Sequence, residues 1–141
     1  MSKMTRFKRG VLWAGAVAVT ASLASATVWT QTVALKRLMQ QKLEHSQGIL
    51  AAVVMSNWGE MERHSAAVLQ VTREPAWMAM NTPEYSRQSQ AFVRAAEDLL
   101  DAARRRDLDA APLAYVSMTL SCVQCHRYVA RTRIAGALDV R

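Results

Sequence analysis

The chain has 141 residues, a formal net charge of +7 and hydrophobic residues at 51% of its positions. Four of its 18 Lys and Arg, but none of its 11 Asp and Glu, lie within the first nine residues. The remainder carries 14 basic and 11 acidic side chains, so its net charge is only +3. A charge this small gives no reason to expect a nucleic-acid partner. The length after this basic start suits one domain with one modest core.

The N-terminus has the three parts of a secretory signal peptide. A basic stretch (1–9) is followed by an uncharged stretch rich in Ala, Val and Leu, which ends in Ala24-Ser25-Ala26. This order predicts export and cleavage after Ala26, leaving a domain over 27–141. Apolar character continues to Trp29, which is just long enough for a membrane span, so an uncleaved anchor is the alternative. Both interpretations predict a periplasmic domain, and only the second attaches it to the membrane.

The first half of the domain is expected to form two helices. Apolar residues recur with helical spacing over about 31–57 and again over 58–73, and Pro75 ends the second helix. The inward stripe of the first helix is expected to be Met39, Leu43, Ser46, Leu50, Val53 and Asn57, widened by Leu35, Leu38 and Ile49. The stripe of the second is expected to be Met61, Ser65, Val68 and Thr72.

The second half is expected to form two more helices. Thr82 and Pro83 are suited to the N-cap and first position of the third helix, which ends in a run of arginines over 104–106. Asp107 or Asp109 caps the fourth, which Gly136 ends. The inward residues are expected to be Tyr85, Phe92, Ala96, Leu99 and Ala103 in the third helix, and Leu113, Val116, Leu120 and Val123 in the fourth. Four helices with short connections and no strand pattern predict an all-α, up-down-up-down antiparallel four-helix bundle.

The most specific motif lies near the end of the fourth predicted helix. Residues 122–126 are Cys-Val-Gln-Cys-His, and Cys122 and Cys125 are the only cysteines of the chain. This pattern is the attachment signature of c-type haem. Each thiol can form a thioether with one vinyl group, and His126 can then bind the iron as the proximal ligand. The motif predicts one covalent haem c per chain.

Two other uses of the cysteines remain as alternatives. A Cys-x-x-Cys pair can act as a redox dithiol, but such sites belong to βαβ surroundings and no strand is expected here. A zinc site would need two further ligands from His45, His64 and His126, and none of these has zinc-finger spacing. The alternative from this class is a haem-free redox or metal-binding helical module.

An exported, single-domain helical chain with Cys-x-x-Cys-His near its C-terminus resembles the class II cytochromes c, the cytochrome c′ group. The resemblance covers the whole domain in architecture but only 122–126 as a strict motif. It implies thioethers at Cys122 and Cys125, a proximal ligand at His126 and, in many members, pairing of two chains through helix faces. The family's Tyr-Arg pair, three and four residues after the histidine, is replaced here by Val129-Ala130, and Tyr128 and Arg131 flank those positions.

The second iron ligand is expected from the first helix. His126 lies seventeen residues after Asp109, and the same distance back from Asn57 along an antiparallel helix reaches residue 40. Met39 is therefore the predicted distal ligand, which would give a six-coordinate site suited to electron transfer. His45, about one turn farther along, is the alternative ligand. An apolar residue such as Leu43 over the iron would instead leave the site open to a small gas.

These features predict a periplasmic haem protein that carries one electron. The alternative within the same family is a five-coordinate protein that binds NO or CO. No paired carboxylates, nucleophile–base pair or phosphate loop indicates an enzyme. The expected partner is a redox protein that the sequence does not identify.

Overall fold

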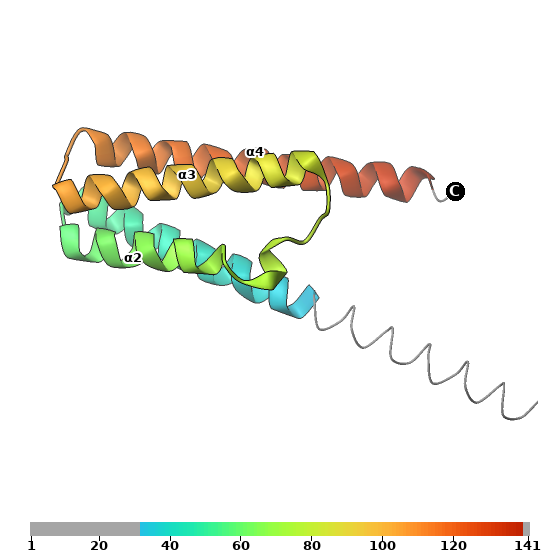
Figure 1. The fold of residues 1–141 in the computed structure, drawn as a ribbon, viewed down its shortest axis with the longest axis horizontal. Helices are drawn as coiled ribbons and strands as arrows, with labels where there is room; N and C mark the ends of the chain where they lie inside the picture. Colours follow the sequence, from blue (N-terminus) through green and yellow to red (C-terminus); the bar gives the residue numbers. More distant parts are fainter. Residues whose placement is uncertain (1–31, 140–141) are drawn as a thin grey trace, which may run out of the picture. The chain divides into compact units, whose positions relative to one another are not determined.

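The computed structural model describes residues 32–139 (Figure 1). The chain divides into two compact units, residues 1–36 and 37–141, and the second is treated by itself below. The predicted signal peptide, with its cleavage site after Ala26, lies outside the described residues. None of the described helices is both long and apolar enough to cross a membrane.

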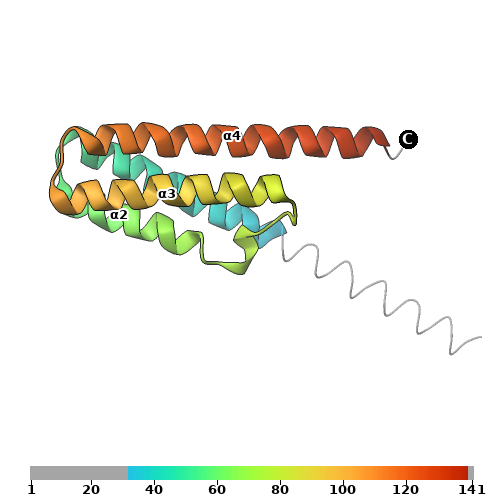
Figure 2. The ribbon, with the colours of Figure 1, turned by 45° about the horizontal axis from the view of Figure 1, so that its top comes forward.

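The described chain is all-α, with four helices. A helix over residues 32–54 is followed by α2 (Trp58–Val71), a short 3-10 turn η1 (Pro75–Trp77), α3 (Pro83–Arg105) and α4 (Ala110–Asp139). Successive helices contact one another, α2 with α3 and α3 with α4, as in an up-down bundle. Figure 2 shows α4 running along α3 and continuing past the residue at which α3 begins. The overrun starts near Tyr128, whose hydroxyl lies 2.9 Å from Oγ1 of Thr82.

The predicted starts of three helices are confirmed. α2 begins at Trp58 as predicted, but Asn57, expected on the inward stripe of the preceding helix, is its cap and accepts the N–H of Glu60. Thr82 caps α3 by accepting the N–H of Tyr85, with Pro83 at the first position. Of the two aspartates considered for α4, Asp107 is the cap, because its Oδ1 accepts the N–H of Ala110 at 2.9 Å. Each cap satisfies a backbone donor that the first turn of a helix leaves free.

The core confirms the predicted inward faces of α2 and α3. The large, fully buried side chains include Met61 and Val68 from α2 and Phe92 and Leu99 from α3. The small residues Ala96, Ala102 and Ala103 are also buried, which lets neighbouring helices approach closely. Hydrophobic spacing alone therefore correctly predicts which faces of these two helices are buried.

The predicted face is right in part for the helix 32–54 and wrong for α4. In the helix 32–54, Leu38 and Ile49 are buried as predicted, together with Lys42 and Ala52, whereas Leu43 and Leu50 are exposed. In α4 the predicted stripe is exposed, and Ala111, Met118 and Ser121 are buried instead. Small or polar side chains take several of the buried positions in these helices, so the positions of the larger apolar residues alone did not identify the buried side.

The predicted end of α4 is also wrong, because the helix continues through Gly136 to Asp139. A single glycine costs a helix only about 1 kcal/mol. The surrounding sequence offers no competing cap, and the helical turns on both sides carry the backbone through this position.

Candidate functional site around Cys122 and Cys125

The two cysteines lie one helical turn apart on α4. Both are free thiols and both are half-buried, and Cys122 packs against the hydrophobic core. His126 follows on the same helix and is exposed. A helix presents residues three and four apart on one side, so the motif offers both sulfur atoms toward the bundle interior.

Lys42 is the charged residue that lies beside these thiols in the bundle. Its side chain is only 7% exposed, although lysine is almost never fully buried without a partner. The ammonium lies over two aromatic rings, 3.7 Å from the centroid of Phe92 and 4.8 Å from that of Trp77. Among the described residues no carboxylate forms an ion pair with it. Lys42 is thus a buried cation whose neighbours are aromatic faces and sulfur.

The pKa values around the motif reflect this burial. Burial lowers the pKa of Lys42, and this shift is opposed by Cys122 and Cys125, including a hydrogen bond to Cys122. Burial also raises the pKa of the Cys125 thiol, against the effect of the Lys42 charge. Partial burial, followed by the charge of Lys42, lowers the pKa of His126. The lowered pKa favours the neutral imidazole, the form of histidine that can bind a metal.

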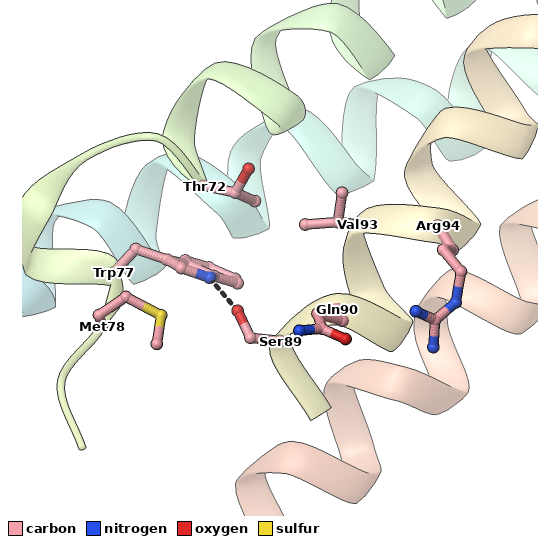
Figure 3. Close-up of a pocket in the computed structure, with 7 residues that line it drawn as sticks. All are labelled: Thr72, Trp77, Met78, Ser89, Gln90, Val93 and Arg94. Atoms are coloured by element: carbon pink, nitrogen blue, oxygen red, sulfur yellow. Dashed lines mark hydrogen bonds between the residues drawn. The ribbon is translucent and has the colours of Figure 1, made fainter. Parts of the chain in front are cut away.

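Aromatic side chains from η1 and α3 form the apolar wall beside Lys42. The rings of Trp77 and Phe92 lie 5.5 Å apart, and the Tyr85 hydroxyl donates a hydrogen bond to the Trp77 carbonyl at 2.5 Å. The Trp77 indole N–H donates to Ser89, as the dashed line in Figure 3 shows. These bonds fix the tryptophan in one orientation, which is typical of a buried aromatic with a polar atom.

A surface pocket lies beside Trp77 and Ser89. Figure 3 shows it between the end of α2, the Trp77 segment and α3, lined by Thr72, Trp77, Met78, Ser89, Gln90, Val93 and Arg94. Neither cysteine of the motif nor His126 lines it. The pocket therefore meets the surroundings of the motif only at Trp77 and at Ser89, which accepts the Trp77 hydrogen bond.

The two predicted distal ligands have different surroundings. Met39 is half-buried and packs against the core, one turn before Lys42 on the same helix. His45 is engaged with α2 instead, because its Nδ1 lies 3.1 Å from Nδ1 of His64. The Nε2 atom of His64 in turn lies 2.9 Å from the Arg63 guanidinium. A hydrogen-bond chain from Arg63 through His64 to His45 thus engages both ring nitrogens of His64 and the Nδ1 atom of His45.

Within residues 32–139 no group of three or more His, Cys, Asp or Glu is placed to hold a metal ion. Of the three histidines considered for a zinc site, His45 and His64 pair with each other, and His126 lies on α4.

Lys42 is the site residue that the sequence analysis missed. The buried face of its helix runs through Leu38, Lys42, His45 and Ile49 at four- and three-residue spacing. The same spacing was visible in the sequence, but a charged residue in it indicated a surface position. Only the packing of this helix against α4 shows that Lys42 meets the cysteines.

Comparisons of the chain with protein-family models, with curated proteins and with solved structures found no match. The four-helix, all-α fold is therefore the level at which the chain is classified.

Proposed function

We propose that this protein is a periplasmic c-type cytochrome of the class II kind, which carries one electron on a single covalent haem. The proposal starts from the pentapeptide 122–126, which supplies two thiols and a histidine in the order required for haem attachment. A five-residue motif can arise by chance, so its surroundings have to suit the same group.

The observation that carries the proposal is the position of Lys42 beside these thiols. A buried ammonium without an acidic partner has a large desolvation cost. Haem bears two carboxylates, the kind of group that this part of the core lacks. The adjoining rings of Trp77 and Phe92 are the apolar surface that a porphyrin needs. The donors, the charge and the aromatic wall therefore suit haem together.

The residues then have separate roles. Cys122 and Cys125 would hold the group through thioethers, and His126 would bind the iron with its neutral imidazole. Met39 is the proposed second axial ligand, because it lies on the helix that meets the motif and is not engaged by another polar group. When bound, haem supplies a one-electron couple whose potential depends on its axial ligands, buried charge and solvent access.

The test is the absorption spectrum of the exported protein, with and without carbon monoxide. We expect haem that stays attached to the chain in acid–acetone and a low-spin reduced spectrum that carbon monoxide hardly changes. A high-spin spectrum that shifts with carbon monoxide would assign the protein to gas binding instead. A colourless exported protein would leave the haem-free dithiol or metal-binding module as the better explanation.

A further inference from the structure

The surface pocket beside Trp77 takes no part in the proposed function. Its volume is about 310 Å³, at the small end of the range of ~300 to 1,000 Å³ that small-molecule sites have. It lies where the end of α2, the segment around Trp77 and α3 converge (Figure 3). Neither cysteine of the haem motif nor His126 lines it. A pocket with its own set of lining residues can bind a group other than the haem.

Part of the pocket wall is apolar and held in place. It consists of the Trp77 indole and the side chains of Met78 and Val93. The indole N–H donates to Ser89, and the Trp77 carbonyl accepts the hydrogen bond of the Tyr85 hydroxyl. An aromatic side chain that is already fixed loses little freedom when a ligand packs against it, which favours binding.

The rest of the wall contains polar side chains with hydrogen-bond donors that the chain itself does not use. Gln90 and Arg94 lie one turn apart on α3 and therefore on the same side of this helix. Neither side chain forms a hydrogen bond or an ion pair with another described residue. The Ser89 hydroxyl is buried and accepts the Trp77 N–H, which leaves its own O–H to donate. Donors from three residues thus lie beside the apolar part of the wall.

The charge of the pocket favours an anion. Arg94 lines the pocket, and no acidic side chain is among its lining residues. Glu97 and Asp98 follow Arg94 at the three- and four-residue spacing that permits pairing on a helix, yet neither forms an ion pair with it. The guanidinium therefore keeps its parallel N–H donors for a carboxylate, which can accept two of them with its two oxygens.

A carboxylate suits the pocket better than a phosphate does. A phosphate monoester carries a charge of about −1.5 to −2, and phosphates are commonly bound at the N-terminus of a helix. The lining residues of α3 lie well inside that helix, and Thr72 lies at the C-terminal end of α2. Arg94 is the only cation among the lining residues. One positive charge away from any helix N-terminus matches a ligand with one negative charge.

We propose that this pocket binds a small monocarboxylate with an aromatic body. Its carboxylate accepts hydrogen bonds from Arg94 and Gln90, and its ring packs against Trp77, Met78 and Val93. An aromatic ring is favoured because offset or edge-to-face contact with the indole adds to the effect of the apolar area that it buries. The residues that bind the acid are different from those of the haem motif, so the proposal does not rest on the haem assignment.

The test is a titration of the exported protein with 3-phenylpropionate, followed by calorimetry and by the NMR signal of the Trp77 indole N–H. This signal is identified by its absence from the spectrum of Trp77→Phe. We expect saturable binding of one acid per chain, with a Kd of about 1 mM or lower, and a shift of the Trp77 signal. The uncharged amide, 3-phenylpropionamide, has the same shape and should bind at least about tenfold more weakly.

Arg94→Gln tests the charge without disturbing the core, because Arg94 is exposed. It should weaken the binding of 3-phenylpropionate at least about tenfold. The control Arg133→Gln removes an exposed arginine of α4 that lies outside the pocket and forms no ion pair with a described residue, so it should leave the Kd unchanged. The absence of saturable binding would overturn the proposal, as would an amide that binds as tightly as the acid or an Arg94→Gln variant with the native Kd. None of these results would affect the haem assignment.

Discussion

Lys42 shows how one side chain connects the fold with the proposed chemistry. It lies on the buried stripe of its helix, yet it brings a charge into a region of aromatic rings and thiols. The faces of Phe92 and Trp77 offset part of the desolvation cost through cation–π contact. Because the chain offsets so little of the desolvation cost of this ammonium, Lys42 is well placed to contact a negatively charged group.

If the chain carries the proposed haem, replacing Lys42 with Gln should lower its midpoint potential. A nearby positive charge favours the reduced iron, whose net charge is one unit less positive, and low solvent access keeps this effect large. We expect a decrease on the order of tens of mV, measured by spectroscopic redox titration. Arg73→Gln removes an exposed charge and should leave the potential nearly unchanged. An equal change in both variants would mean that Lys42 has no special relation to the haem.

Replacing Met39 with Ala should convert the proposed low-spin His/Met haem site into a five-coordinate site. Loss of the thioether frees one axial position, so carbon monoxide should bind faster and more tightly. The spectrum of the reduced protein with and without carbon monoxide measures this change. His45→Ala serves as the comparison, since His45 pairs with His64. A spectrum that responds to the His45 change and not to the Met39 change would make His45 the ligand.

At the level of whole elements, the helix 32–54 approaches α2 closely at Gly48. A Cβ atom added there would lie 2.5 Å from Cε1 and 2.7 Å from Cδ2 of the His64 ring. The ring would have to move and would lose its contacts with His45 and Arg63. The absence of a side chain at Gly48 therefore leaves room for the His64 ring, and this glycine does not break the helix.

Gly48→Ala should destabilise the protein by roughly 1 kcal/mol, because the clash outweighs the better helix propensity of alanine. In the His64→Ala background the same change should stabilise the protein by roughly 0.5–1 kcal/mol, since only the propensity gain remains. Denaturant unfolding of the four proteins in a double-mutant cycle measures both values. If Gly48→Ala has the same sign in both backgrounds, the close approach to His64 does not determine the outcome.

The sequence predicts the helices better than it predicts their orientation. Helix ends follow from local chemistry, so Thr82 and Pro83 identify the start of α3. The faces of α2 and α3 follow from large apolar residues such as Met61 and Phe92, which are buried. In α4 the core instead takes Ala111 and Ser121 among its residues, and the larger apolar side chains lie outside. Apolar spacing cannot distinguish a core face from an uncovered one.

The candidate site likewise has one part that the sequence identifies and another that depends on packing. Cys122, Cys125 and His126 are adjacent in sequence, so the motif could be identified without a fold. Lys42 is eighty residues from Cys122, and only packing brings them together. The pairing of His45 with His64 also depends on how two helices meet. Hydrophobic periodicity therefore could not predict the contacts between residues that are distant in the sequence.

At the level of the whole molecule, the chain should be exported and released after Ala26. The order of basic, apolar and small residues is that of a cleaved signal peptide. N-terminal sequencing of the periplasmic protein should begin at Thr27. Recovery of an intact Met1 segment in the membrane fraction would instead show an anchored domain, and a cytoplasmic protein would contradict export.

Covalent haem on Cys122 and Cys125 is the property on which the proposed function depends most. The decisive measurement is the intact mass and visible spectrum of the exported protein, compared with those of Cys122→Ser/Cys125→Ser. We expect the native chain to carry the mass of one haem. The double variant should lack it and should unfold more easily, because a bound group stabilises the fold that holds it. A native chain exported without haem, or a double variant that keeps covalent haem, would contradict the proposal.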